Sequence, residues 1–198
     1  MKTAVFGGSF DPVHIGHLFI AEETKLDLEY ERILFVPAYQ PPHKNNGPHA
    51  SSHHRLEMLR VAIGQRRDFV VDPWEITRGG VSYTIDTVRY VLENFTISGR
   101  LGLIIGDDNA KDFNSWRESR LLLDTVDIIV AGRTGEDYDA VLGAGYRSID
   151  NTRLPVSSSD IRSRIGAGRA YRYLVPEAVY DYIRHHHLYQ DAYAGSDG

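Results

Sequence analysis

The chain has no cysteine, which excludes disulfides, zinc–thiolate sites and cysteine nucleophiles. It has no apolar run near the roughly 18 residues that a membrane span requires, and the apolar run at its N-terminus is too short for a signal peptide. It also has no excess of basic charge, because 27 acidic residues outnumber 22 Lys and Arg residues and the net charge at pH 7 is −5, whereas nucleic-acid binding usually needs a basic surface. We therefore expect a cytoplasmic protein that binds neither membranes nor nucleic acid.

What the chain does contain is typical of a globular protein. Of its 198 residues, 42% are hydrophobic and 25% are charged, which is enough for one α/β domain with its own core. No internal repeat or linker divides it, so we expect a single domain over residues 1–189. The small and polar residues 190–198 predict a disordered tail. Composition leaves homo-oligomerisation undecided.

Short apolar runs alternate with segments of helical periodicity. The runs predict buried strands at Thr3–Phe6, Ile33–Val36, Phe69–Val71, Leu101–Ile105 and Asp127–Ala131. The periodic segments predict helices that carry Ile15, Leu18, Phe19 and Leu26, then Ser52–Ile63, then Ile85, Val88, Leu92 and Phe95, then Ser157–Ile165 and Pro176–His186. The alternation predicts βαβ units and a mainly parallel sheet flanked by helices.

Ligands bind beyond the carboxyl ends of the strands in such a sheet, which here means the loops that begin at Gly7, Pro37 and Gly106. The loop after Pro37 is rich in Pro, Asn and Gly. A loop of that length in a compact domain is usually functional. We expect its segment from about residue 40 to residue 49 to be mobile and to become ordered when nucleotide binds.

The segment from Gly7 to His17, GGSFDPVHIGH, is the most informative part of the chain. Its paired glycines let the backbone approach a ligand, and the backbone N–H groups of the following helix start favour an anion. His14 and His17 are three residues apart and share a face in a helical turn, and Gly16 keeps the turn between them free of a side chain. They could contact phosphates, serve as a cap and a surface residue, or ligate a metal, which would need a third ligand.

GGSFDPVHIGH resembles the signature of the HxGH nucleotidyltransferase superfamily. The resemblance implies a Rossmann-like doubly wound fold, ATP as substrate and attack on its α-phosphorus. It also implies Mg²⁺ that is carried by the ATP phosphates, with no protein ligand.

Further segments narrow the resemblance to bacterial nicotinate mononucleotide adenylyltransferases. They are PPHK at 41–44, HR-x-x-M-L at 54–59, SYTIDT at 82–87, Gly106-Asp107 with Trp116, VSSSDIR at 156–162 and the pattern over 175–189. The segments occur in the family's order over roughly residues 1–189. They differ from the family pattern in details such as Ser159, where threonine is usual. The implied reaction joins ATP to nicotinate mononucleotide and gives deamido-NAD and pyrophosphate.

The resemblance also implies roles for individual residues. The catalytic group is His14, His17, Lys44 and Arg162. The ATP-binding group is Gly7, Gly8, Ser9, Phe10, Gly16, Gly106, Asp107, Ser157 and Ser158. The acceptor-binding group is His43, Ser82, Tyr83, Thr84 and Trp116.

Most of these residues have a structural alternative. Lys44 could be a solvated loop lysine, and Trp116 a core or surface indole. Thr84 could cap the helix that follows it, and the serines before Arg162 could be N-caps. Two further arginines are undecided: Arg55 could contact ligand or form a surface ion pair, and Arg133 could contact ligand after the fifth strand. The run His185–His187 could bind metal, although a basic cluster at a helix end is the better interpretation.

Other functions remain to be weighed. A related transferase could act on nicotinamide mononucleotide or phosphopantetheine, although SYTIDT, PPHK and Trp116 oppose the latter. An aminoacyl-tRNA synthetase fragment would share the His-x-Gly-His string, but no KMSKS-like loop follows. A non-catalytic nucleotide-binding module would not need His14, His17, Lys44 and Arg162 intact.

Overall fold

The computed structural model describes residues 1–42, 49–131, 138–143, 145–149 and 154–190. Within them, six parallel strands form one sheet in the order β3-β2-β1-β4-β5-β6. The strands are β1 (Thr3–Gly8), β2 (Arg32–Pro37), β3 (Phe69–Val71), β4 (Leu101–Gly106), β5 (Val126–Ala131) and β6 (Arg147–Ile149). This is the Rossmann-type order, so the predicted fold class is confirmed.

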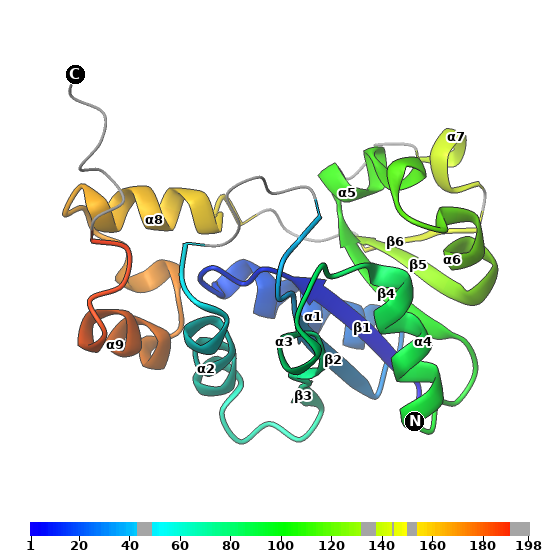
Figure 1. Cartoon of the computed structure of the whole chain (residues 1–198), viewed down its shortest axis with the longest axis horizontal. Coiled ribbons are helices and arrows are strands. Elements are labelled where there is room, and N and C mark those ends of the chain that lie inside the picture. Colours follow the sequence, from blue (N-terminus) through cyan, green and yellow to red (C-terminus); the bar gives the residue numbers. More distant parts are fainter. Residues whose placement is uncertain (43–48, 132–137, 144, 150–153, 191–198) are drawn as a thin grey trace.

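Helices cover both faces of the sheet (Figure 1). One core lies beneath α1 (Ile15–Asp27), α2 (Ser52–Ile63), α8 (Ser158–Gly166) and α9 (Glu177–His185). The other core lies beneath α4 (Thr84–Asn94), α5 (Asp107–Lys111), α6 (Ser119–Thr125) and α7 (Asp139–Leu142). The remaining short elements are α3 (Trp74–Arg78), η1 (Phe113–Ser115) and η2 (Arg172–Leu174).

The chain order of the strands reverses between β1 and β4. From β1 the chain moves outward through β2 to β3, and it then returns to the other side of β1 as β4. The loops that follow β1 and β4 lead to opposite faces of the sheet, which opens a crevice beyond the carboxyl ends of these two strands. In Figure 1, β1 runs upward from the N-terminus at the lower right, so its carboxyl end points toward α8.

Several expectations about elements need correction. The apolar pattern does not predict β6, whose Arg147 and Ser148 are exposed, or the short helices α3, α5, α6 and α7. Leu26 and Leu92 belong to the expected helical spacings of apolar residues, but they are 63% and 42% exposed. Val91 takes the buried place on α4 instead. Pro176 is the N-cap of α9 and not its first helical residue.

Residues 191–198, which contain nearly all of the expected tail, lie outside the described residues. So does 43–48, within the loop that was expected to be mobile. Among the helices that the structure does describe, none is long and apolar enough to cross a membrane.

Candidate active site

A cavity of about 580 Å³ opens at the carboxyl ends of β1 and β4. Its walls include the Gly7–Phe10 loop, the segment after β2, the start of α4 and the segment after η1. The lining residues are Val5, Gly7, Gly8, Ser9, Phe10, His17, Ala38, Pro41, Pro42, Glu75, Ser82, Tyr83, Thr84, Thr87, Leu103, Ile104, Ile105, Asn109, Ser115, Trp116, Arg117 and Ser158. The cavity therefore lies where the strand order predicts a ligand.

His17 presents a defined face to this cavity. It lies on the first turn of α1, and its Nδ1 accepts a hydrogen bond of 3.2 Å from the backbone N–H of His14. A neutral imidazole that accepts through Nδ1 carries its proton on Nε2. His17 therefore has Nε2–H as its remaining donor, at a helix start that already favours anions.

The two histidine rings stack, with their centroids 3.7 Å apart. Burial lowers the pKa of His14 to about 4. Burial, followed by the repulsion of His14, lowers the pKa of His17 well below its usual value. Both rings are therefore neutral at pH 7 in the absence of ligand. His14 is 7% exposed and does not line the cavity, so it supports His17 through the backbone hydrogen bond and the stacking.

The glycines of this segment have different surroundings. A Cβ on Gly7 would meet nothing within 4 Å, which leaves the backbone open to a ligand, whereas a Cβ on Gly8 would lie 3.2 Å from the Phe10 ring. Gly16 does not line the cavity. A Cβ there would lie 2.9 Å from Cγ1 of Val156, so the packing of α1 already requires this glycine.

Arg162 is tied to the loop that carries the signature. Its Nη1 donates to the carbonyl oxygen of Asp11 at 2.6 Å and lies 3.8 Å from the carboxylate of the same residue. The side chain does not line the cavity. Before it, Ser157 caps α8, while Ser158 lines the cavity and donates to the carbonyl of Pro12 at 2.9 Å. The N-cap alternative is thus correct for Ser157.

Asp11 organises the rim of this loop. Its buried carboxylate accepts from the backbone N–H of His49 at 2.7 Å and of Ala50 at 3.0 Å. It also accepts from the hydroxyl of Tyr189 at 2.8 Å. One carboxylate thereby joins the signature loop to the start of α2 and to the C-terminal segment.

Arg55 is neither a surface ion-pair partner nor a cavity residue. It is 1% exposed, and it donates to backbone carbonyls of the loops around the cavity. The acceptors are those of Ser9, Ala38, Tyr39 and Ala50, at 2.8, 2.6, 3.1 and 3.3 Å. Because buried carbonyls without partners are costly, Arg55 holds two cavity-lining loops together.

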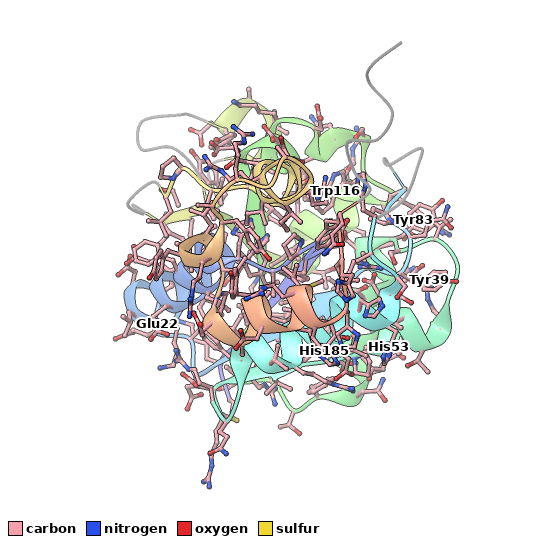
Figure 2. The ribbon with its side chains drawn as sticks, turned by 90° about the vertical axis from the view of Figure 1, so that its left-hand side faces the viewer. Glu22, Tyr39, His53, Tyr83, Trp116 and His185 are labelled. Carbon is pink, nitrogen blue, oxygen red and sulfur yellow. The ribbon has the colours of Figure 1, made fainter. Side chains whose placement is uncertain are left out.

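The opposite end of the cavity is aromatic and includes the start of α4. Tyr83 is the N-cap of α4, and no side chain caps this helix. Thr84 is therefore the first residue of α4 and not its cap. Trp116 lies beside Phe113, with ring centroids 5.1 Å apart, and borders the same cavity as Tyr83. Figure 2 labels Trp116 and Tyr83. The structure thus brings Ser82, Tyr83, Thr84 and Trp116 together.

Sequence reasoning missed five polar residues that line the cavity, namely Glu75, Thr87, Asn109, Ser115 and Arg117. Arg117 lies 4.8 Å from the ring centroid of Tyr83 and adds positive charge to the wall. Glu75 and Thr87 also line the cavity, and the Thr87 hydroxyl donates to Oε1 of Glu75. Only Thr87 carried a signal, because it closes the SYTIDT segment.

The remaining expected site residues lie elsewhere. Gly106 ends β4 and Asp107 begins α5, but neither lines the cavity. Asp107 accepts from the hydroxyl of Tyr138 at 2.6 Å. His43, Lys44 and Arg133 lie outside the described residues.

The residues that the structure describes include no group of three or more His, Cys, Asp or Glu side chains that could hold a metal ion. His185 ends α9 and His186 is its C-cap, which agrees with a helix-end cluster. His186 packs on Tyr182 and His54, with centroids 4.2 and 5.2 Å away.

Comparisons with known proteins place this geometry in context. The model of the family described as "Cytidylyltransferase-like" matches residues 5–164. A probable nicotinate-nucleotide adenylyltransferase of Treponema pallidum (strain Nichols) is 40% identical, with 96% of this chain and 100% of the relative covered. One of Borreliella afzelii is 38% identical, with 96% and 97% covered.

Solved structures share the fold. Nicotinic acid mononucleotide adenylyltransferase of Plasmodium falciparum, complexed with NaAD, superposes with a TM-score of 0.75 at 21% identity. The match covers 96% of this chain and 98% of that one. From its relatives at 38–40% identity over almost their full length, the chain belongs to the nicotinate-nucleotide adenylyltransferases of the cytidylyltransferase-like family.

Proposed function

We propose that this protein transfers the adenylyl group of ATP to nicotinate mononucleotide, giving deamido-NAD and pyrophosphate. The observation that carries the proposal is that His17, at the start of α1, lines the same cavity as Trp116 and the start of α4. One end offers donors for phosphates, and the other offers a ring-stacking surface and backbone N–H groups. The names of the relatives agree with this reaction.

The acceptor brings its own nucleophile. The second pKa of a phosphate monoester is about 6, so the 5′-phosphate of the acceptor is largely dianionic at pH 7. One of its oxygens forms a bond to the α-phosphorus of ATP, and the bond from that phosphorus to the bridging oxygen breaks. Pyrophosphate leaves with that electron pair. No general base is needed, so the protein contributes alignment and charge stabilisation.

At the ATP end, His17 would donate from Nε2–H to the phosphates while charge moves onto the leaving group. The hydrogen bond at its Nδ1 and its place in the cavity wall support this role. Gly7, Gly8, Ser9 and Phe10 supply backbone in the cavity wall. The neutral state of His17 avoids the cost of a buried charge before ATP arrives. Following the family resemblance, we assign Mg²⁺ to the phosphates of the incoming ATP.

Lys44, His43 and Arg162 remain assigned to the substrates as predictions. Arg162 has one guanidinium nitrogen, Nη1, on the carbonyl of Asp11, and Nη2 bonds to Ser159 at 3.2 Å. A phosphate at the rim could compete for these donors. Asp107, Gly106, Ser157 and Gly16 likewise remain predicted ATP-binding residues.

At the acceptor end, Trp116 would stack on the pyridine ring. The uncapped start of α4 would direct backbone N–H groups at the ring carboxylate. Ser82 and Tyr83 fix this start, because the backbone N–H of Ser82 donates to the carbonyl of Gln40 at 2.9 Å.

The reaction is tested by pyrophosphate release from ATP in the presence of nicotinate mononucleotide, nicotinamide mononucleotide or phosphopantetheine. We expect the nicotinate acceptor to give the highest kcat/KM. If phosphopantetheine is the only acceptor that supports pyrophosphate release, the protein is the related transferase and the proposed function is wrong. If the protein binds ATP but releases no pyrophosphate with any acceptor, it is a non-catalytic nucleotide-binding module.

We also propose that the enzyme acts in the cytoplasm without nucleic acid as a partner. Gel filtration with light scattering would settle whether it is a homo-oligomer.

A further inference from the structure

Glu75 is the one acidic side chain in the described wall of the cavity. It lies on the short helix α3, is hydrogen-bonded to Thr87 of α4, and is 5% exposed. A buried carboxylate so close to a site for a negatively charged acceptor needs a physical explanation, because like charges repel strongly when water is excluded.

The hydrogen bonds of Glu75 are incomplete. Oε1 accepts from the hydroxyl of Thr87, on the first turns of α4. Oε2 is buried and makes no hydrogen bond of normal geometry among the described residues, although the Ser82 side chain lies close enough to stabilise the ionised carboxyl group. Three buried side-chain atoms lack a partner there, on His14, Tyr30 and Glu75, and only Glu75 lines the cavity. Since buried polar groups are normally satisfied, Oε2 is a position at which a ligand group is expected.

We propose that Glu75 is a specificity-determining residue for the acceptor, and that its Oε2 distinguishes a carboxylate from a carboxamide on the ring according to whether Glu75 carries a proton. This inference rests on the proposed function. A protonated Oε2 donates a hydrogen bond, which suits a carboxylate. An ionised Oε2 only accepts, which suits the NH₂ of an amide and repels the acid.

The surroundings favour the protonated form of Glu75 more than water would. Burial raises the pKa of Glu75, and the Ser82 and Thr87 hydroxyls and the charge of Arg78 oppose the rise, while Asp86 adds to it. Arg55 also interacts electrostatically with Glu75 from α2. A bound nicotinate carboxylate would raise the pKa of Glu75 further, because two adjacent carboxylates share a proton.

The test is the ratio of kcat/KM for nicotinate over nicotinamide mononucleotide, measured from pH 6 to pH 9. Both acceptors carry the same phosphate, so its titration cancels in the ratio. In the wild type, we expect the ratio to fall at least threefold as the pH rises. In Glu75→Gln, whose side chain has the same shape and can donate at every pH, we expect acid preference to persist with no pH dependence.

Thr87→Val provides a matched variant that leaves Glu75 in place. It removes a hydroxyl that stabilises the ionised carboxyl, so the fall in the ratio should move to higher pH. Thermal melting of each variant shows whether it is folded. The dissociation constants of the two acceptors, measured by calorimetry across the same pH range, should follow the kinetic ratio.

The outcomes separate the two proposals. If wild type and Glu75→Gln show parallel ratios across the pH range, the role of Glu75 is refuted while the reaction stands. If the wild-type protein turns over neither pyridine acceptor, the proposed function itself is wrong.

Discussion

His17 is the residue on which the chemistry depends most directly. Its Nδ1 is occupied by the backbone of His14, so Nε2–H is free for the triphosphate. We expect His17→Ala to lower kcat by roughly 10²–10³ with little change in KM, because such a donor acts mainly in the transition state. Steady-state pyrophosphate release measures this. His185→Ala, at the exposed end of α9, is the control. A His17→Ala enzyme within threefold of wild type would remove the assignment.

His14 should make the free energy of unfolding depend on pH. The pKa of His14 is lowered to about 4 in the folded protein from 6.5, so the unfolded chain binds more protons between these values. The stabilising contribution is therefore complete above pH 6.5 and is lost as the pH falls toward 4. For this group the loss is on the order of 3 kcal/mol.

Urea unfolding at several pH values between 4 and 7 checks this expectation. His14→Asn should show a smaller drop in the free energy of unfolding over that range than the wild type. An equal drop in both proteins would show that other groups dominate acid unfolding.

At the scale of elements, the start of α1 depends on Gly16. A Cβ at this position would lie 2.9 Å from Val156 and 3.1 Å from Nδ1 of His14, so either α1 or the segment before α8 must shift. We expect Gly16→Ala to destabilise the fold by about 1–3 kcal/mol, as overpacking does. Val156→Ala should partly restore it in the double variant. Thermal unfolding compares these with Gly145→Ala, where a Cβ meets nothing within 4 Å.

Elements with strong apolar patterns were predictable from the sequence. The five predicted strands have ends within two residues of those observed, and α2 matches at both ends. β6 gave no signal, because two of its three residues are exposed and only Ile149 is buried. On α4, the helical spacing of apolar residues included Leu92, whereas the buried side chain is that of its neighbour Val91. Spacing alone does not distinguish two apolar residues that are adjacent in the sequence.

The site was predictable where a local motif carries the chemistry, as in the loop from Gly7 to His17. Arg55 and Glu75 could not be placed in this way. Their partners lie in other segments: Arg55 bonds to carbonyls as far away as Ser9, and Glu75 bonds to Thr87. Burial of a charged side chain is a tertiary property, and sequence spacing gives no measure of it.

At the scale of the whole molecule, the C-terminal segment is joined to the signature loop. Tyr189 is 9% exposed and packs in the same core as α1 and α2. Its hydroxyl donates to Asp11, 178 residues away in sequence. Burial and then the charge of Asp11 raise the pKa of Tyr189, so the hydroxyl remains a donor across the physiological range.

The chain should therefore tolerate shortening up to Tyr189 but not past it. We expect a protein that ends at Gln190 to keep the melting temperature and kcat of the full chain, because the expected domain ends at residue 189. A protein that ends at Leu188 loses a buried ring and leaves Asp11 without one donor, which together should cost about 2–4 kcal/mol of unfolding free energy.

Tyr189→Phe in the full chain separates the two contributions, because it removes only the hydroxyl. This variant should cost about 1–2 kcal/mol. Calorimetric melting and pyrophosphate release measure all three proteins. If the protein that ends at Leu188 melts at the same temperature as the full chain, the C-terminal segment contributes nothing to the stability of the domain. If Tyr189→Phe lowers kcat while the melting temperature stays close to that of the wild type, Asp11 transmits the loss of the hydroxyl through Arg162 to the signature loop.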